Sequence, residues 1–156
     1  MTGPVAERVR AAGDWSNAAE RCVLTYDERF LRRKRLSCES GFQFLCDLEK
    51  TTSLEEGAAL ELDDGRFVEI VAASEPLYEV SGSDLARLAW HIGNRHTPCQ
   101  IGEHALLIQR DKVIGHMLEH LGATLSEVER PFTPEGGAYG HGRTHSHEHG
   151  ATAHAH

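Results

Sequence analysis

The segment from residue 136 to the C-terminus limits the fold most, because it contains almost no side chain that a protein core could bury. Its residues are mainly glycine, alanine, serine and histidine. Such a composition cannot offset the conformational entropy lost when a chain becomes ordered. We therefore predict a disordered histidine-rich tail over residues 136–156. The folded structure must come from the residues before it, which are enough for one ordinary domain or two small ones.

Short β-strands are predicted in the first half of the chain. Asp64-Gly65 between two apolar runs is a strong hairpin signal, because the turn residues need positive φ angles. The strand candidates are residues 21–26, 31–38, 42–48, 59–62 and 67–71. Pro76 disfavours helix in the residue before it, so a hinge is expected at residues 72–76. We predict a small all-β domain over residues 1–75, as a candidate partner-binding domain.

The pattern after Pro76 changes to alternating strands and helices. Two apolar stripes at helical spacing, one at residues 85–92 and one within residues 111–121, predict two helices. Ser81-Gly82-Ser83 offers capping hydroxyls for the first helix, Gly93-Asn94 fits its C-terminal cap, and Gly122 ends the second. Strands are expected at residues 77–80, 99–109 with a bend near 102–103, and 124–129, with Pro131 and Pro134 ending the ordered chain.

This order of elements, β-α-β-β-α-β, predicts a ferredoxin-like domain over residues 76–135. The fold class is therefore α+β. It combines a small N-terminal all-β domain, the ferredoxin-like domain and the disordered histidine-rich tail.

Charge and hydropathy exclude several classes of partner. The formal net charge is −8 with histidine neutral, so a nucleic acid would be repelled. The basic run at residues 32–35 is typical of a solvated strand or turn, and the alternative is a docking patch for an acidic protein. The N-terminus lacks a signal-peptide core, and no stretch approaches the roughly 20 apolar residues of a membrane helix. We expect a cytoplasmic protein that binds neither nucleic acid nor membrane.

The four cysteines form no Cys-x-x-Cys pair, which excludes zinc-knuckle and thioredoxin sites. In a reducing cytosol they are expected as buried or free thiols. Cys99 lies three residues after His96, but a small packed residue is the favoured interpretation.

Histidine is the residue that points to chemistry. Imidazole nitrogen suits nickel, copper and zinc, and alternating histidines let two rings of one segment reach the same ion. The candidate tail ligands are His141, His145, His147, His149, His154 and His156. The alternative is a purification tag, but Arg143, Glu148 and glycines interrupt the spacing. Irving–Williams ordering makes Zn²⁺ and Cu²⁺ competing ions in vitro.

His96 is the candidate ligand in the folded part. It follows the first helix and precedes Thr97-Pro98. A surface or capping histidine is the alternative from spacing alone. One imidazole cannot hold a transition ion by itself, but a two-fold dimer places a second copy opposite the first, because the same patch meets itself.

The sequence also contains His116-x-x-Glu119-His120, the pattern of inverzincin proteases. The match is short, and the chain is small for a peptidase with a third ligand and a cleft. Two solvated histidines on the polar flank of a helix are the simpler interpretation, and a weak surface metal site formed by the pair is the alternative. No phosphate-binding loop and no G-x-S-x-G motif occurs, so we expect no catalytic residue and no enzyme activity.

Residues 88–101, which read LAWHIGNRHTPCQI, resemble the signature of the UreE family of urease accessory nickel chaperones. Residues 64–73 (DGRFVEIVAA), Pro131-Phe132 and Gly136-Gly137-Ala138-Tyr139 also look like that family, as does the order of domains. The His-x-Gly-Asn-Arg-His core is fairly specific, whereas a histidine-rich tail alone is not.

This resemblance implies a homodimer that delivers Ni²⁺ to apo-urease with an accessory GTPase and the other accessory proteins. It implies that His96 is the principal ligand, that it meets its symmetry mate, and that tail histidines complete the shell. His91 is then structural. Where some members have a His-x-His pair, this chain has Arg110-Asp111-Lys112, which makes that extra site doubtful. The competing hypotheses are a metal buffer and, after it, a zinc metallohydrolase using His116.

Overall fold

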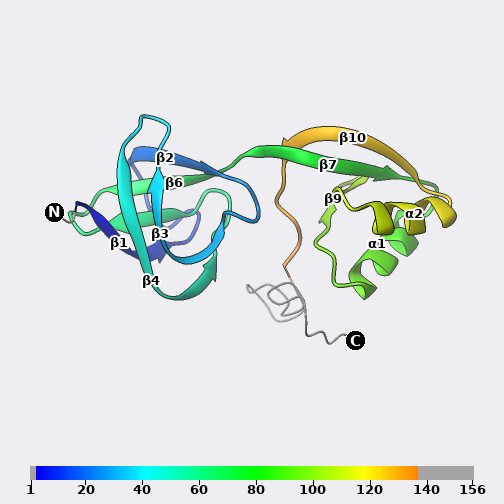
Figure 1. Cartoon of the computed structure of the whole chain (residues 1–156), viewed down its shortest axis with the longest axis horizontal. Coiled ribbons are helices and arrows are strands. Elements are labelled where there is room, and N and C mark those ends of the chain that lie inside the picture. Colours follow the sequence, from blue (N-terminus) through cyan, green and yellow to red (C-terminus); the bar gives the residue numbers. More distant parts are fainter. Residues whose placement is uncertain (1–2, 137–156) are drawn as a thin grey trace. The chain divides into compact units, whose positions relative to one another are not determined.

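The protein is described by a computed structural model that covers residues 3–136. The predicted tail and all six of its histidines lie outside the described residues, apart from Gly136. The chain divides into two compact units, Met1–Ala73 and Ser74–His156. Within the described part the fold is mixed α+β, mostly strands with two helices (Figure 1).

Unit 1 is a six-stranded sheet with the strand order β2-β6-β5-β1-β4-β3. Its strands are β1 (Val5–Arg10), β2 (Ala18–Leu24), β3 (Phe30–Ser37), β4 (Gln43–Ser53), β5 (Ala59–Leu62) and β6 (Phe67–Ala72). The pairs β1/β4 and β2/β6 are parallel, and the other neighbours are antiparallel. The backbone N–H of Glu39, just beyond β3, donates to the carbonyl of Arg21 in β2 at 2.9 Å. The two edge strands are therefore brought together, and the sheet curls around its core (Figure 1).

The hairpin predicted at residues 63–65 is present between β5 and β6. Gly65 has φ +91°, a value that favours glycine. The backbone N–H of Arg66 donates to Asp64 Oδ1 at 3.0 Å, and its Nε donates to Oδ2 at 2.9 Å. These hydrogen bonds, the backbone one foremost, lower the pKa of the Asp64 carboxyl.

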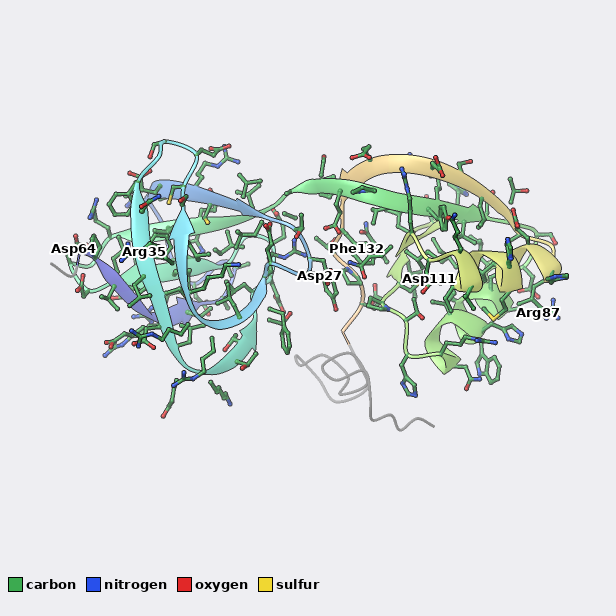
Figure 2. All side chains as sticks on the ribbon, in the orientation of Figure 1. Asp27, Arg35, Asp64, Arg87, Asp111 and Phe132 are labelled. Carbon is green, nitrogen blue, oxygen red and sulfur yellow. The ribbon has the colours of Figure 1, made fainter. Side chains whose placement is uncertain are left out.

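Strand β1 was not predicted, because only Ala6 of its six residues is buried and the strand has no apolar alternation. The predicted strands at 21–26, 31–38 and 42–48 are confirmed with shifted ends. The basic run Arg32–Arg35 lies exposed along β3, and Figure 2 labels Arg35 there.

The aliphatic core of unit 1 contains three cysteine thiols. Cys22, Cys38 and Cys46 are all buried and free, as expected. Burial raises the pKa of the Cys22 thiol to about 11 and those of Cys38 and Cys46 to about 12. Their thiolates are scarce at neutral pH, so these residues act as small apolar side chains.

Unit 2 contains the two helices and a four-stranded sheet with the order β10-β7-β9-β8. Its elements are β7 (Ser74–Ser81), α1 (Leu85–Asn94), β8 (Gln100–Ile101), β9 (Leu106–Gln109), α2 (Lys112–His120) and β10 (Thr124–Pro131). All three neighbouring strand pairs are antiparallel. Leu88 and Ile92 of α1 share one apolar core with Ile114 and Leu118 of α2 and with the sheet, so both helices cover the same face (Figure 1). Neither helix is long and apolar enough to cross a membrane.

Two proline positions correct the sequence prediction. Pro76 does not mark a hinge of several residues, because β6 ends at Ala72 and β7 begins at Ser74. Pro76 lies inside β7, opposite Glu129 of β10. The pairing with β9 starts only at Leu77, so β7 has one neighbouring strand at this point and tolerates a missing N–H. Pro131 corrects the predicted end of the last strand from residue 129 to residue 131, because it still pairs with Ser74 in β10.

Candidate metal centre

Helix α1 ends in a Schellman motif with His96 at its centre. The backbone N–H of His96 donates to the carbonyl of Gly93 at 2.9 Å, and that of Thr97 donates to the carbonyl of Ile92 at 3.3 Å. This pair of bonds requires a left-handed residue just after the C-cap, a position that usually holds glycine. Here Arg95 is the C-cap and His96 is the left-handed residue, with φ +59°.

This geometry corrects the predicted helix end. Gly93 and Asn94 belong to α1 itself, although their residue types favour a cap. The helix includes both residues and ends at Asn94, and the fully buried side chain of Ile92 holds this last turn in the core of unit 2. The start is corrected as well: the side chain of Asp84, and not a hydroxyl of residues 81–83, accepts the backbone N–H of Arg87 at 3.1 Å.

Helix α2 ends in the same motif, with glycine, the usual residue, in the left-handed position. The backbone N–H of Gly122 donates to the carbonyl of Glu119, and that of Ala123 donates to the carbonyl of Leu118, both at 3.0 Å. Gly122 has φ +94° and holds the place that His96 holds after α1. A side chain in this conformation is disfavoured by roughly 1–2 kcal/mol relative to ordinary backbone. The chain therefore places an exposed imidazole at a strained position where glycine would relieve the strain.

We expect His96→Gly to raise the free energy of unfolding by about 0.5–1 kcal/mol, since glycine adopts this φ without strain but loses more entropy on folding. The reciprocal change, Gly122→Ala, should lower it by a similar amount. A Cβ at Gly122 would meet no atom within 4 Å, so the effect isolates the backbone. Urea denaturation followed by circular dichroism at 222 nm measures both. A His96→Gly protein that is clearly less stable would show that the imidazole supports the fold.

The segment after β10 returns to the loop that follows His96. The backbone N–H of Thr133 donates to the side-chain oxygen of Gln100, and that of Glu135 donates to the carbonyl of Cys99, both at 2.9 Å. Phe132, which lies in the sequence between the end of β10 and Thr133, is fully buried. These contacts fix residues 132–135, within the predicted domain that ends at residue 135. Sequence reasoning did not predict the contacts themselves, since Pro131 and Pro134 with phenylalanine and threonine between them give only a loop signal.

The pKa of the Cys99 thiol reflects how close the segment after β10 lies to the loop that follows His96. Burial, and after it the negative charge of Glu135, raises the pKa of the Cys99 thiol to about 11. The sulfur is therefore a protonated packing group at neutral pH, as the sequence suggested, and a poor metal ligand.

These hydrogen bonds hold the start of the C-terminal segment beside Cys99 and Gln100, which follow His96 by three and four residues. The chain between Glu135 and His141 can span up to about 20 Å, and that between His96 and Cys99 about 10 Å. Chain length therefore allows the first tail histidine to approach the His96 imidazole. His141, His145, His147, His149, His154 and His156 themselves lie outside the described residues.

Two other features surround the His96 loop. His91 is partly buried and its ring lies edge-on to that of Trp90, with centroids 5.0 Å apart. Trp90 and Ile101, on either side of His96 in the sequence, are large apolar side chains that are 62% and 54% exposed. Among residues 3–136, no group of three or more histidine, cysteine or carboxylate side chains is placed to hold a metal ion.

Comparison with known proteins identifies the family. Residues 4–73 match the model of the UreE urease accessory protein N-terminal domain, and residues 75–156 match that of its C-terminal domain. The chain belongs to the UreE family of urease accessory proteins. The Urease accessory protein UreE of Ruegeria pomeroyi is 63% identical over 96% of this chain and 100% of its own length. Those of Cereibacter sphaeroides and Rhodobacter capsulatus are 59% and 54% identical, over 94% and 93% of this chain and 81% and 92% of their own.

UreE proteins are accessory chaperones and not enzymes. The pattern His116-x-x-Glu119-His120 therefore has no hydrolytic role, and the metallohydrolase hypothesis is set aside. The resemblance stated from residues 88–101 is confirmed for both domains of the family.

Proposed function

We propose that this protein is a nickel metallochaperone that binds Ni²⁺ and delivers it for assembly of the urease active site. The observation that carries the proposal is the exposed His96 in a strained left-handed position, within a chain of the UreE family. Proteins keep such strain mainly where function needs a side chain at a fixed place. Neutral imidazole nitrogen is a suitable ligand for Ni²⁺.

The ligand set in this proposal joins His96 to histidines of the tail. The hydrogen bonds that hold Thr133 and Glu135 beside the His96 loop support it, because they start the tail close to that imidazole. His141, His145, His147, His149, His154 and His156 supply the further imidazoles, and Zn²⁺ or Cu²⁺ would compete for them in vitro. Ni²⁺ is the cargo here and not a resident cofactor.

A homodimer completes the proposed centre by bringing two copies of His96 together. Trp90 and Ile101 support this assembly, because large exposed apolar side chains near one loop are typical of an interaction surface. In a two-fold dimer the same patch meets itself, so a residue near the axis meets its own copy. One ion could then bind at a symmetric place that a partner protein can recognise.

The remaining parts of the proposal concern the domains, the partners and the compartment. Unit 2 is taken as a ferredoxin-like domain, which its β-α-β-β-α-β order and the strand order β10-β7-β9-β8 support. The N-terminal domain, 1–75 in the sequence prediction, is taken as the partner-binding part, and 76–135 as the metal-binding part. The partners are an accessory GTPase and the apo-urease complex in the cytoplasm. The net charge of −8 speaks against nucleic acid.

The test is activation of apo-urease at limiting Ni²⁺ with its accessory GTPase, with and without this protein. We expect activation to rise when the nickel-loaded protein is supplied, and the protein to form a complex with the GTPase. The control is an equal amount of nickel held by a histidine peptide with the sequence of residues 137–156. If the peptide activates urease equally well and no complex with the GTPase forms, the protein is a metal buffer and the delivery proposal is wrong.

A further inference from the structure

His116 and His120 stand one helical turn apart on α2, and both are exposed. Side chains four residues apart lie on the same face of an α-helix, with Cβ atoms about 5–6 Å from each other. Within residues 3–136, neither imidazole is engaged in a hydrogen bond, an ion pair or a ring contact. Both nitrogens of each ring are therefore available to a ligand from solvent.

The backbone beneath the two histidines is fixed at both ends of the helix. Asp111 Oδ1 accepts the backbone N–H groups of Val113 and Ile114 at 2.9 and 3.1 Å, and Figure 2 labels Asp111 at the start of α2. The Schellman motif at Gly122 closes the other end. Little backbone entropy remains to be lost when a ligand joins the two rings, because the helix is already formed.

Packing of the opposite face fixes the orientation of α2. Ile114 and Leu118 are buried in the core of unit 2. A Cβ at the buried Gly115 would lie 3.0 Å from the Leu125 side chain and 3.3 Å from that of Tyr78, so the helix sits directly against the sheet. The helix cannot roll about its axis without breaking these contacts, and His116 and His120 stay on the solvent side.

Charge on this face favours a cation. Glu119 is exposed and lies between the two histidines in sequence, on the same side of the helix. His120 is the last residue of α2, where the helix dipole adds partial negative charge. Imidazole nitrogen is a ligand that late first-row divalent ions accept, and the Glu119 charge adds an attraction that the exposed Lys112, four residues before His116, partly opposes.

We propose that His116 and His120 form a second metal site, a two-imidazole chelate for Zn²⁺, Cu²⁺ or Ni²⁺ on the surface of α2. Each ring contributes one nitrogen, and water completes the coordination shell, since the described residues offer no third ligand placed with them. The site is distinct from the His96 centre and does not depend on the nickel-delivery proposal. It adds to the chain an ion-binding position whose two ligands lie on one rigid element.

The test is a titration of the full chain with zinc chloride, followed by NMR of isotopically labelled histidine rings. Zn²⁺ is diamagnetic, so ring signals shift only when their own nitrogens bind or a close neighbour does. We expect the His116 and His120 signals to move together with one apparent Kd. In His120→Gln the affinity seen at His116 should fall by about a hundredfold, because the second ligand of the chelate is gone. His116→Gln should do the same to the signal of His120.

His104→Gln is the matched control. His104 is also exposed and lies 3.5 Å from the Glu103 carboxylate, but it has no second imidazole one helical turn away. Its loss should leave the His116 titration unchanged. Glutamine is a good helix former, and circular dichroism at 222 nm verifies that α2 is intact in each variant. The proposal is wrong if His116 titrates with the same affinity in His120→Gln, or if neither signal moves in a large excess of Zn²⁺.

Discussion

His96→Asn is expected to abolish urease activation at limiting nickel while leaving the fold unchanged. Asparagine tolerates the left-handed conformation at φ +59° but offers no imidazole to the ion. If the proposed dimer centre holds, the loss of one ligand from each of two protomers should weaken Ni²⁺ binding there by more than about a hundredfold, since even outer-shell changes around metals cost about 10–100-fold. Activation assays and isothermal titration with Ni²⁺ measure the two effects.

The matched control for this variant is a chain that ends at Tyr139 and so lacks the six tail histidines. It should bind fewer ions in total and activate urease only in part, because His96 remains. His96→Asn should show the reverse, with nearly full capacity and no activation. His96→Gly, the variant expected to be more stable, should fail in activation just as completely. If His96→Asn activates fully and the shortened chain not at all, the tail and not His96 is the delivery site.

Ile92→Ala is expected to destabilise unit 2 by about 2–5 kcal/mol and to weaken nickel binding with it. The Ile92 side chain is fully buried, and its carbonyl accepts the backbone N–H groups of Arg95 and Thr97 that shape the loop around His96. A cavity under the last turn of α1 should loosen that loop. The two helices of the described structure both belong to unit 2, so circular dichroism at 222 nm follows its unfolding in urea.

The matched control is Phe44→Ala in the core of unit 1, which should cost about 3–5 kcal/mol of unit 1 stability. Trp15 reports on this unit, because its Nε1–H donates to the Gly57 carbonyl at 2.9 Å and its ring contacts Phe67. Its fluorescence, read in a Trp90→Phe background, should show the lower midpoint. At urea concentrations below the unfolding midpoint of unit 1, nickel binding by Phe44→Ala should be unchanged. Equal losses of nickel affinity in both variants would show that the His96 loop responds to stability in general.

The sequence predicted well those elements that local chemistry determines. Asp64-Gly65 identified its hairpin because few residue pairs adopt the required backbone angles. The two helices followed from apolar stripes such as Leu88 and Ile92, whose spacing matches one buried face. The family signature in residues 88–101 singled out His96, whereas spacing alone favoured a surface or capping role for it.

The features that escaped prediction depend on contacts between distant residues. Strand β1 has one buried side chain, and its place in the sheet comes from pairing with β4 and β5. Gly93-Asn94 gave the stronger local cap signal, and only the burial of Ile92 moves the end of α1 on to Arg95. The return of Glu135 to Cys99 is a hydrogen bond across 36 positions in the chain, and no local pattern indicates it.

Burial of the three thiols in unit 1 determines which donor atoms of the folded protein are open to a metal ion. A thiolate is a soft, strong ligand that would hold copper, zinc or nickel tightly and release it slowly. Only the deprotonated sulfur binds, and burial raises the pKa of Cys22 to about 11 and those of Cys38 and Cys46 to about 12. The folded N-terminal domain therefore keeps these three sulfur atoms from binding a metal ion. Under the proposed function, unfolding of this domain would expose thiols that release Ni²⁺ slowly, so an intact domain favours exchange of the ion between histidines.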